Sequence, residues 1–183
     1  MQCPQCKGSQ LQPVTLETGL VAAGCLQCGG SLLPLLNYRY WQQTTEQHSI
    51  EKDNEFSAED SAGAKLCPKC ARLMSKYRIG HDQDNRLELC ATCDEAWLDA
   101  GEWSLLKSCE MHQQLPRIFT DAWQRLIRLT EQEASVRENF RNRLGEVQFA
   151  KADEFRQWLN QQQGKADILQ YLSIRPASNS TCE

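Results

Sequence analysis

The chain has 183 residues, of which 40% are hydrophobic and 24% are charged, and its formal net charge is −4. No stretch approaches the roughly 20 consecutive apolar residues of a membrane-spanning helix, which excludes an integral helical membrane protein. The negative charge disfavours general binding to nucleic-acid phosphates. A length of this order fits one domain or a few small units joined together.

Ten cysteines are the most informative feature, because eight of them form four C-x-x-C pairs: Cys3/Cys6, Cys25/Cys28, Cys67/Cys70 and Cys90/Cys93. The opening residues lack the pattern of a secretory signal, so we expect a cytoplasmic protein with reduced thiols. A disulfide framework or a pair of redox motifs is the alternative interpretation. A redox C-x-x-C normally occurs once within a βαβ pattern, which is absent here, so metal ligation is favoured.

The spacing of the pairs predicts two structural zinc sites. Eighteen residues separate Cys6 from Cys25 and nineteen separate Cys70 from Cys90, which is the interval typical of four-cysteine zinc sites. Four thiolates close the coordination sphere of Zn²⁺, so each ion would stabilise the fold and leave no position for catalysis. We therefore expect two structural zinc ions per chain.

The residues between the pairs predict β-hairpins. The first insert turns at Thr18-Gly19, and the second turns at the polar stretch 81–85, with alternating apolar residues on both sides. Both inserts follow a C-P-x-C pair, in which proline favours a tight turn. We call residues 1–43 repeat 1 and residues 66–110 repeat 2, and expect each to be a zinc ribbon.

Two segments lie between the second and third cysteine pairs, and each needs its own interpretation. The aromatic run Tyr38–Trp41 could stack on nucleic-acid bases, but packing beneath repeat 1 is favoured because Arg39 is its only basic residue. Residues 44–65 carry six acidic and two basic side chains and few large apolar ones. Such a composition predicts a flexible acidic linker between the repeats.

After Cys93 the chain continues D-E-A-W-L-D-A-G-E-W-S-L-L. Together with the preceding C-P-x-C and C-x-x-C pairs, this run resembles the zinc ribbon of the transcription-factor-IIB type, in which the second pair leads into W-L-D-x-G-E and a short helix. The likeness covers Cys67 to about Leu106. Repeat 1 keeps the ligands and loses the tail, because Leu32, Pro34 and Asn37 replace Trp97, Asp99 and Glu102. The resemblance implies zinc binding with adaptor or transcription-related roles.

The tail of repeat 2 has two interpretations. Asp99 and Glu102 have the three-residue spacing of a capping box, with Trp97 packed on the ribbon. Alternatively, Trp97, Asp99 and Glu102 form a docking surface. The structural interpretation is favoured, and all three residues stay candidate docking positions.

Residues 111–172 have the periodicity of amphipathic helix, and 173–183 are expected to be a disordered tail. Apolar residues keep one helical face from Phe119 to Leu159. A bend at Thr130 or Gly145 stays open, so the sequence does not decide between a continuous arm and a hairpin. The face must be covered, and its candidate docking residues are Phe119, Trp123, Phe140 and Trp158.

These patterns predict a small zinc-stabilised β protein, two tandem zinc ribbons with an α-helical C-terminal arm. The favoured function is a zinc-binding adaptor that uses its ribbons and helical arm to contact a protein partner, with a transcription-related role. Self-association through the arm is a further option. Selective nucleic-acid binding is the alternative. Cys109 and His112 lie three residues apart, but a third site would need two more ligands and His48 and His81 are the only other histidines, so such a site is disfavoured. An active site built from Asp99, Glu102 and His112 is disfavoured, and no enzymatic activity is expected.

Overall fold

The computed structural model describes residues 1–6, 8–45 and 63–174. The chain divides into two compact units, Met1–Glu131 (unit 1) and Gln132–Glu183 (unit 2). Most of the predicted acidic linker, residues 46–62, and most of the predicted tail, 175–183, lie outside the described residues. Among the described helices, none combines the length and the apolar character that crossing a membrane requires.

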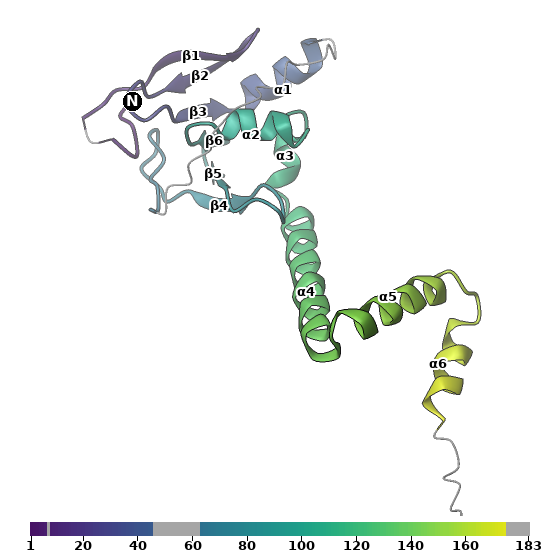
Figure 1. Ribbon diagram of the computed structural model, residues 1–183. Helices are drawn as coiled ribbons and strands as arrows, with labels where there is room; N and C mark the ends of the chain where they lie inside the picture. The colour runs from purple at the N-terminus through teal and green to yellow at the C-terminus, as the bar shows by residue number, and fades with distance from the viewer. Residues whose placement is uncertain (7, 46–62, 175–183) are drawn as a thin grey trace, which may run out of the picture. The chain divides into compact units, whose positions relative to one another are not determined.

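Unit 1 is built on a six-stranded antiparallel sheet with strand order β1-β2-β3-β6-β5-β4 (Figure 1). The first three strands belong to repeat 1 and the last three to repeat 2. Their bounds are β1 Gln12–Glu17, β2 Leu20–Gly24, β3 Ser31–Pro34, β4 Ser75–Arg78, β5 Arg86–Cys90 and β6 Glu95–Leu98.

The two expected hairpins are present. Strands β1 and β2 meet at Gly19, whose φ of 82° is the left-handed conformation that glycine adopts at least cost. Strands β4 and β5 pair in register from Ser75 opposite Leu89 to Arg78 opposite Arg86. In each repeat the third strand leads toward a helix, α1 (Leu35–Thr44) directly after β3 and α2 (Glu102–Ser108) shortly after β6.

A local two-fold relation connects the repeats. When Cys28 is aligned with Cys93, Leu32 corresponds to Trp97, and these two residues are directly paired between β3 and β6. The same alignment matches Ser31 with Ala96 and Leu33 with Leu98. The two neighbouring pairs, Ser31 with Leu98 and Leu33 with Ala96, are therefore equivalent to each other. The repeats therefore join through equivalent strands, as two subunits do across an isologous interface.

This shared sheet changes the expected domain organisation. We predicted two ribbons separated by a linker that ran to residue 65, whereas hydrogen-bonded strands cross from one repeat to the other. Lys65, the last residue assigned to the linker, is buried in repeat 2 with 3% of its surface exposed. The alternation of apolar residues within each repeat does not reveal pairing between the repeats, because β3 and β6 lie 60 residues apart along the chain.

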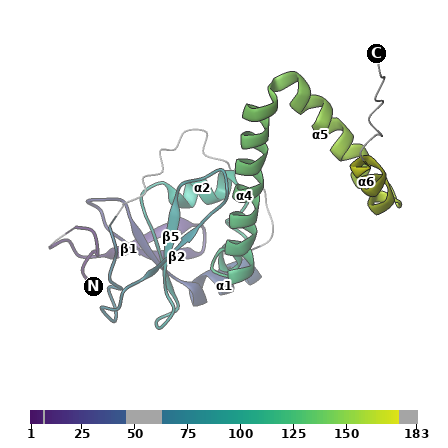
Figure 2. The same ribbon diagram turned by 90° about the horizontal axis from the view of Figure 1, so that it is seen from below.

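The main core of unit 1 lies between the sheet and helices α1, α2 and α3 (Leu115–Ile118) (Figures 1 and 2). Tyr38 of α1 is fully buried, and its hydroxyl donates to the His112 carbonyl at 2.8 Å and accepts the Leu115 N–H. Trp41 is buried as well and donates to the Thr18 carbonyl. Two of the aromatic residues in 38–41 therefore pack in the core, as favoured, while Tyr40 is exposed.

The C-terminal region is helical, as expected. Helix α4 spans Asp121–Leu144, α5 spans Glu146–Asn160 and α6 spans Lys165–Ser173. Of the two bends left open, α4 passes through Thr130 without interruption, and the break falls at Gly145, whose φ is +76°. This left-handed residue ends α4, so the predicted apolar face does not continue along one straight helix.

Candidate metal centres

The eight paired cysteines form two quartets, quartet 1 in repeat 1 and quartet 2 in repeat 2. In each quartet all four Sγ atoms lie within 4.8 Å of one another. The Cys3 and Cys28 sulfurs are 3.7 Å apart, and those of Cys70 and Cys90 are 3.5 Å apart. Tetrahedral zinc–thiolate bonds of about 2.3 Å place sulfurs about 3.8 Å apart, so each quartet could hold a zinc ion.

Tight backbone turns position these thiols. Gly29, Ala71 and Asp94 each follow the second cysteine of a pair and have a left-handed φ of 72°, 56° and 56°. The N–H groups of Gly29 and Ala71 donate to the carbonyls of Cys25 and Cys67. Each of these turns closes over its own C-x-x-C pair, so both sulfurs of the pair face one point.

The protein environment already favours one thiolate in each quartet. Burial opposes ionisation of Cys25, but backbone N–H groups of Cys28 and Gln27 outweigh it and lower the pKa of this thiol to about 7. In quartet 2 the Arg72 N–H lowers the pKa of Cys70 to about 7. Crowding of thiols and burial raise the pKa of Cys28 and Cys93 to about 12, so a cation is needed to ionise all four together.

The two quartets share one buried cluster. Leu32, Met74 and Trp97 pack with the cysteines of both repeats. Trp97 is fully buried, and a Cβ placed on Gly30 would lie 2.4 Å from its ring. The paired residues of the two-fold relation, Leu32 and Trp97, therefore lie among the ligands of both quartets.

Repeat 2 also contains a buried charged cluster that the sequence analysis did not predict. The Lys65 ammonium donates to Glu88 at 2.6 Å and to Asp99 at 2.9 Å, and Trp97 Nε1 donates to the other Asp99 oxygen. Glu102 completes the cluster, and all four charged side chains are at least 96% buried. No clear signal of this cluster was present in the sequence, since Glu88 alternates with Leu87 and Leu89 as a strand residue on the solvent face would.

Shifted pKa values reduce the net negative charge of the cluster. Burial disfavours the Lys65 ammonium, but its bonds to Glu88 and Asp99 outweigh this and raise the pKa. Burial also raises the pKa of Glu102 to about 8, and the nearby carboxylates of Asp99 and Glu88 act in the same direction. Glu102 is therefore mostly protonated at neutral pH, which removes one negative charge from the buried site.

The expected capping box is present in part. Glu102 Oε2 accepts the Asp99 N–H at 2.7 Å, which is the reciprocal half of the motif. Helix α2 is preceded by Gly101 in a left-handed conformation, and no side chain caps it. The Asp99 carboxylate binds Lys65 and Trp97, so this aspartate anchors the tail to the sheet.

The corresponding place in repeat 1 carries no such charges. Met1, Ala23, Pro34 and Asn37 occupy the positions of Lys65, Glu88, Asp99 and Glu102. These four residues help to line an open, largely apolar groove of about 320 Å³. Loss of the tail motif in repeat 1 therefore replaces a filled polar site with a surface groove.

Several of the candidate docking residues are not available at the surface. Trp97, Asp99 and Glu102 are buried, which corrects the docking interpretation of the tail and agrees with the structural one. Phe119 and Trp123 are partly buried against the main core, where Trp123 donates to the Ile79 carbonyl. Phe140 and Trp158 stay accessible, each with nearly half of its surface exposed.

The described residues provide no third cysteine or histidine metal site. Cys109 is exposed and lies outside both quartets. His112 is buried, which lowers its pKa, and its two ring nitrogens have no hydrogen-bond partner among the described residues. The imidazole therefore belongs to the core as a neutral ring.

The comparisons with known proteins found no match, whether to a family model, to a curated protein or to a solved structure. The resemblance to zinc ribbons of the transcription-factor-IIB type therefore rests on the motif residues of repeat 2.

Proposed function

We propose that the protein is a zinc-binding adaptor in which two structural zinc ions stabilise unit 1 and unit 2 binds protein. The two four-thiol quartets carry this proposal, because four cysteine sulfurs at tetrahedral spacing, two of them buried in each quartet, are a ligand set that zinc prefers. Zinc at these sites would hold the thiolates together and contribute folding free energy. The likeness of repeat 2 to a zinc ribbon of the transcription-factor-IIB type supports the same conclusion.

The adaptor part of the proposal rests on where accessible apolar side chains remain. In unit 1 the large residues of the tail and of α3 are buried or packed on the core. In unit 2 apolar residues such as Phe140 and Trp158 are exposed on helices α4 and α5. Exposed apolar surface on this scale is typical of a protein-binding site.

Metal analysis tests the zinc part. Protein purified without added metal should contain two zinc ions per chain. Cys90→Ser should lose the ion of quartet 2 and destabilise its repeat, whereas Cys109→Ser, outside both quartets, should retain two ions. Iron with visible charge-transfer absorption, or no metal at all, would contradict structural zinc.

Affinity capture tests the adaptor part. The full chain loaded with zinc should recover a defined protein partner from lysate, and Phe140→Asp should abolish the capture while zinc content stays unchanged. Asn142→Asp is the matched control, because residues two apart in a helix do not share a face. Equal capture by wild type and Phe140→Asp would exclude this surface as the binding site.

A further inference from the structure

Unit 2 buries very little of its own apolar surface. Among its described residues, 132–174, only Phe149 and Leu159 are buried. Ten large apolar side chains have between 41% and 74% of their surface exposed: Val136, Phe140, Leu144, Val147, Phe155, Trp158, Leu169, Tyr171, Leu172 and Ile174. A segment of this length with two buried side chains has too small a core to be stable alone.

The exposed area matches what one subunit contributes to a stable dimer. Ten side chains of this size, each about half exposed, present on the order of 1,000 Å² of apolar surface. A standard interface buries about 800 Å² on each partner, and the largest apolar patch of a typical monomer is about 300–600 Å². The ten side chains of unit 2 together therefore expose enough apolar area for one side of an interface.

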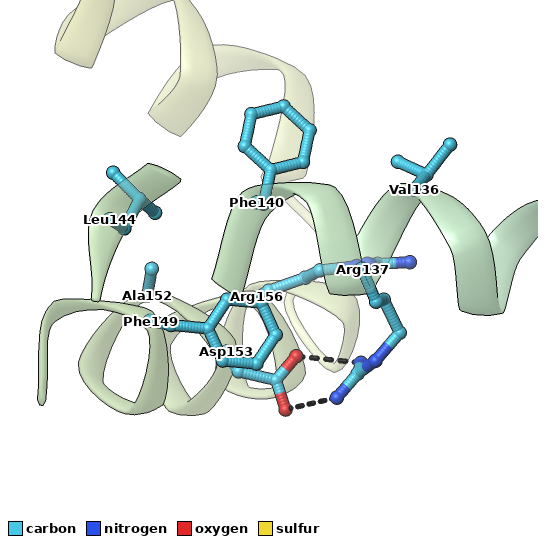
Figure 3. Close-up of a pocket in the computed structure, with 8 residues that line it drawn as sticks. All are labelled: Val136, Arg137, Phe140, Leu144, Phe149, Ala152, Asp153 and Arg156. Atoms are coloured by element: carbon cyan, nitrogen blue, oxygen red, sulfur yellow. Dashed lines mark hydrogen bonds and ion pairs between the residues drawn. The ribbon is translucent and has the colours of Figure 1, made fainter. Parts of the chain in front are cut away.

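The bend between α4 and α5 gives this face a defined shape. A groove of about 330 Å³ is lined by Val136, Phe140, Leu144, Phe149 and Ala152 together with polar residues. Figure 3 shows Arg137 extending from α4 to Asp153 on α5, where the guanidinium makes two hydrogen bonds of 2.7 and 2.9 Å. This bidentate pair holds the two walls of the groove together.

The charge of unit 2 is compatible with a second copy of the chain as the occupant. Residues 132–174 carry six basic side chains (Arg137, Arg141, Arg143, Lys151, Arg156 and Lys165) and six acidic ones (Glu133, Glu138, Glu146, Asp153, Glu154 and Asp167), so their net charge is zero. Arg175 and Glu183 cancel as well, so the whole charge of −4 lies in residues 1–131. Two copies that bind through unit 2 bring together neutral surfaces, so they avoid the like-charge repulsion between two negatively charged units 1. A surface with equal numbers of positive and negative side chains also does not favour a strongly charged foreign partner.

We propose that the apolar face of unit 2 binds a second copy of the same chain. This inference rests on the protein-binding role proposed above and names the first partner: the α4–α5 groove and its neighbouring apolar residues form the interface of a homodimer. Phe140→Asp would then abolish capture of a further protein by separating the two copies. The adaptor is then presented as a pair of zinc-bearing units 1.

Light scattering and sedimentation equilibrium on the full zinc-loaded chain test the proposal. The wild type should show twice the mass of the 20.9 kDa chain and should dissociate on dilution. Phe140→Asp and Trp158→Arg should each weaken dimerisation about 100-fold or more, because each places a charge in the apolar contact. Both variants should keep two zinc ions and the helical circular-dichroism signal, and Asn142→Asp should dimerise as the wild type does.

A wild type that stays monomeric across about a hundred-fold range of concentration would overturn the homodimer. The proposal would also be overturned if both charged variants dimerised with the same affinity as the wild type. A monomer that still captures a foreign protein through Phe140 would overturn the homodimer and leave the adaptor role intact. A dimer that captures no other protein would support the homodimer and contradict the adaptor role.

Discussion

Lys65 is the single cation that the structure buries between Glu88 and Asp99 in repeat 2. Lys65→Met keeps most of the side-chain volume but leaves two buried carboxylates without their common partner. Removing one partner from a buried ion pair costs about 3–5 kcal/mol. We expect the free energy of unfolding to fall by about this amount, as measured by denaturant titration with zinc present.

Lys151→Met, on the exposed surface of α5, serves as the control and should leave stability nearly unchanged. The double variant Lys65→Met/Glu88→Gln should recover part of the loss, because only one of the two buried carboxylates then lacks the Lys65 ammonium. Lys76, whose Nζ lies 3.4 Å from Glu88 Oε1, still partly compensates the Glu88 carboxylate in the single variant. If Lys65→Met lowered the free energy of unfolding no more than Lys151→Met does, the buried carboxylates would have to be neutral in the absence of Lys65.

Glu102 predicts a pH dependence of stability. Its pKa is about 8 in the folded protein against an ordinary value of 4.5, so the folded state holds the proton more tightly. The stabilisation is therefore complete below about pH 4.5 and decreases as the pH rises toward 8. Because acid also displaces zinc from thiolates, unfolding should be measured between about pH 6.5 and 8, where one such group changes stability by up to about 1.4 kcal/mol per pH unit.

Glu102→Gln should remove this part of the slope, since a neutral amide can still accept the Asp99 N–H. Glu146→Gln, at an exposed position of α5, should leave the slope as in the wild type. Identical slopes in all three proteins would show that Glu102 does not titrate in this range.

At the scale of the elements, the pairing of β3 with β6 depends on the space beside Gly30. A Cβ at this position would lie 2.4 Å from Trp97 Cζ2, and the buried ring cannot easily move. Forcing an extra methyl group into a packed core costs about 1–3 kcal/mol. Gly30→Ala should therefore lower the free energy of unfolding by this amount.

Gly63→Ala is the matched control, because among the described residues no atom beyond its chain neighbours lies within 4 Å of its Cβ position. In the background Trp97→Leu, the cost of Gly30→Ala should largely disappear, and a double-mutant cycle measures this coupling. If the effects of Gly30→Ala and Trp97→Leu on the free energy of unfolding were additive, the added methyl group would be accommodated without displacing Trp97.

Local patterns predicted the elements well, and contacts between distant elements escaped them. The turn at Gly19 and the apolar alternation around 81–85 are local signals, so both hairpins were predicted. A break at Gly145 stayed one of two possibilities, because glycine tolerates both helical and left-handed conformations. The burial of Trp123 on Ile79 depends on residues 44 positions apart, and helical periodicity does not show which apolar residues find such partners.

For the whole molecule, the shared cluster predicts that metal binding to the two quartets is coupled. Cys25→Ser removes a ligand of quartet 1, and the loosened repeat 1 should no longer support β6 and Trp97 next to quartet 2. We expect the zinc affinity of quartet 2 to fall about tenfold or more, since binding free energy includes the folding of its surroundings. Competition with a chromophoric chelator measures this zinc affinity.

Cys109→Ser should leave both affinities unchanged, as the side chain is exposed and outside the quartets. An unchanged affinity of quartet 2 in Cys25→Ser would show that the repeats fold and bind metal independently, despite their common sheet.

The ligand set could be predicted because cysteine spacing is a direct consequence of coordination geometry. The charged cluster around Lys65 could not, since each of its charged members looks like an ordinary surface residue in the sequence. The missing tail of repeat 1 was visible in the sequence at Pro34 and Asn37, but its result, an open groove, appears only in three dimensions. Both failures concern contacts between residues far apart along the chain, about which local spacing carries little information.

The covalent link between the repeats makes their pairing independent of protein concentration. A single repeat would meet its equivalent only by collision, whereas within one chain the effective concentration of β6 near β3 is in the millimolar range typical of tethered sites. Because both repeats belong to one chain, their sequences need not be identical. Trp97 can therefore pair with Leu32, and Gly30 provides space for the tryptophan on one side only. Separate copies of one repeat would have to place two tryptophans, or two leucines, in that same space.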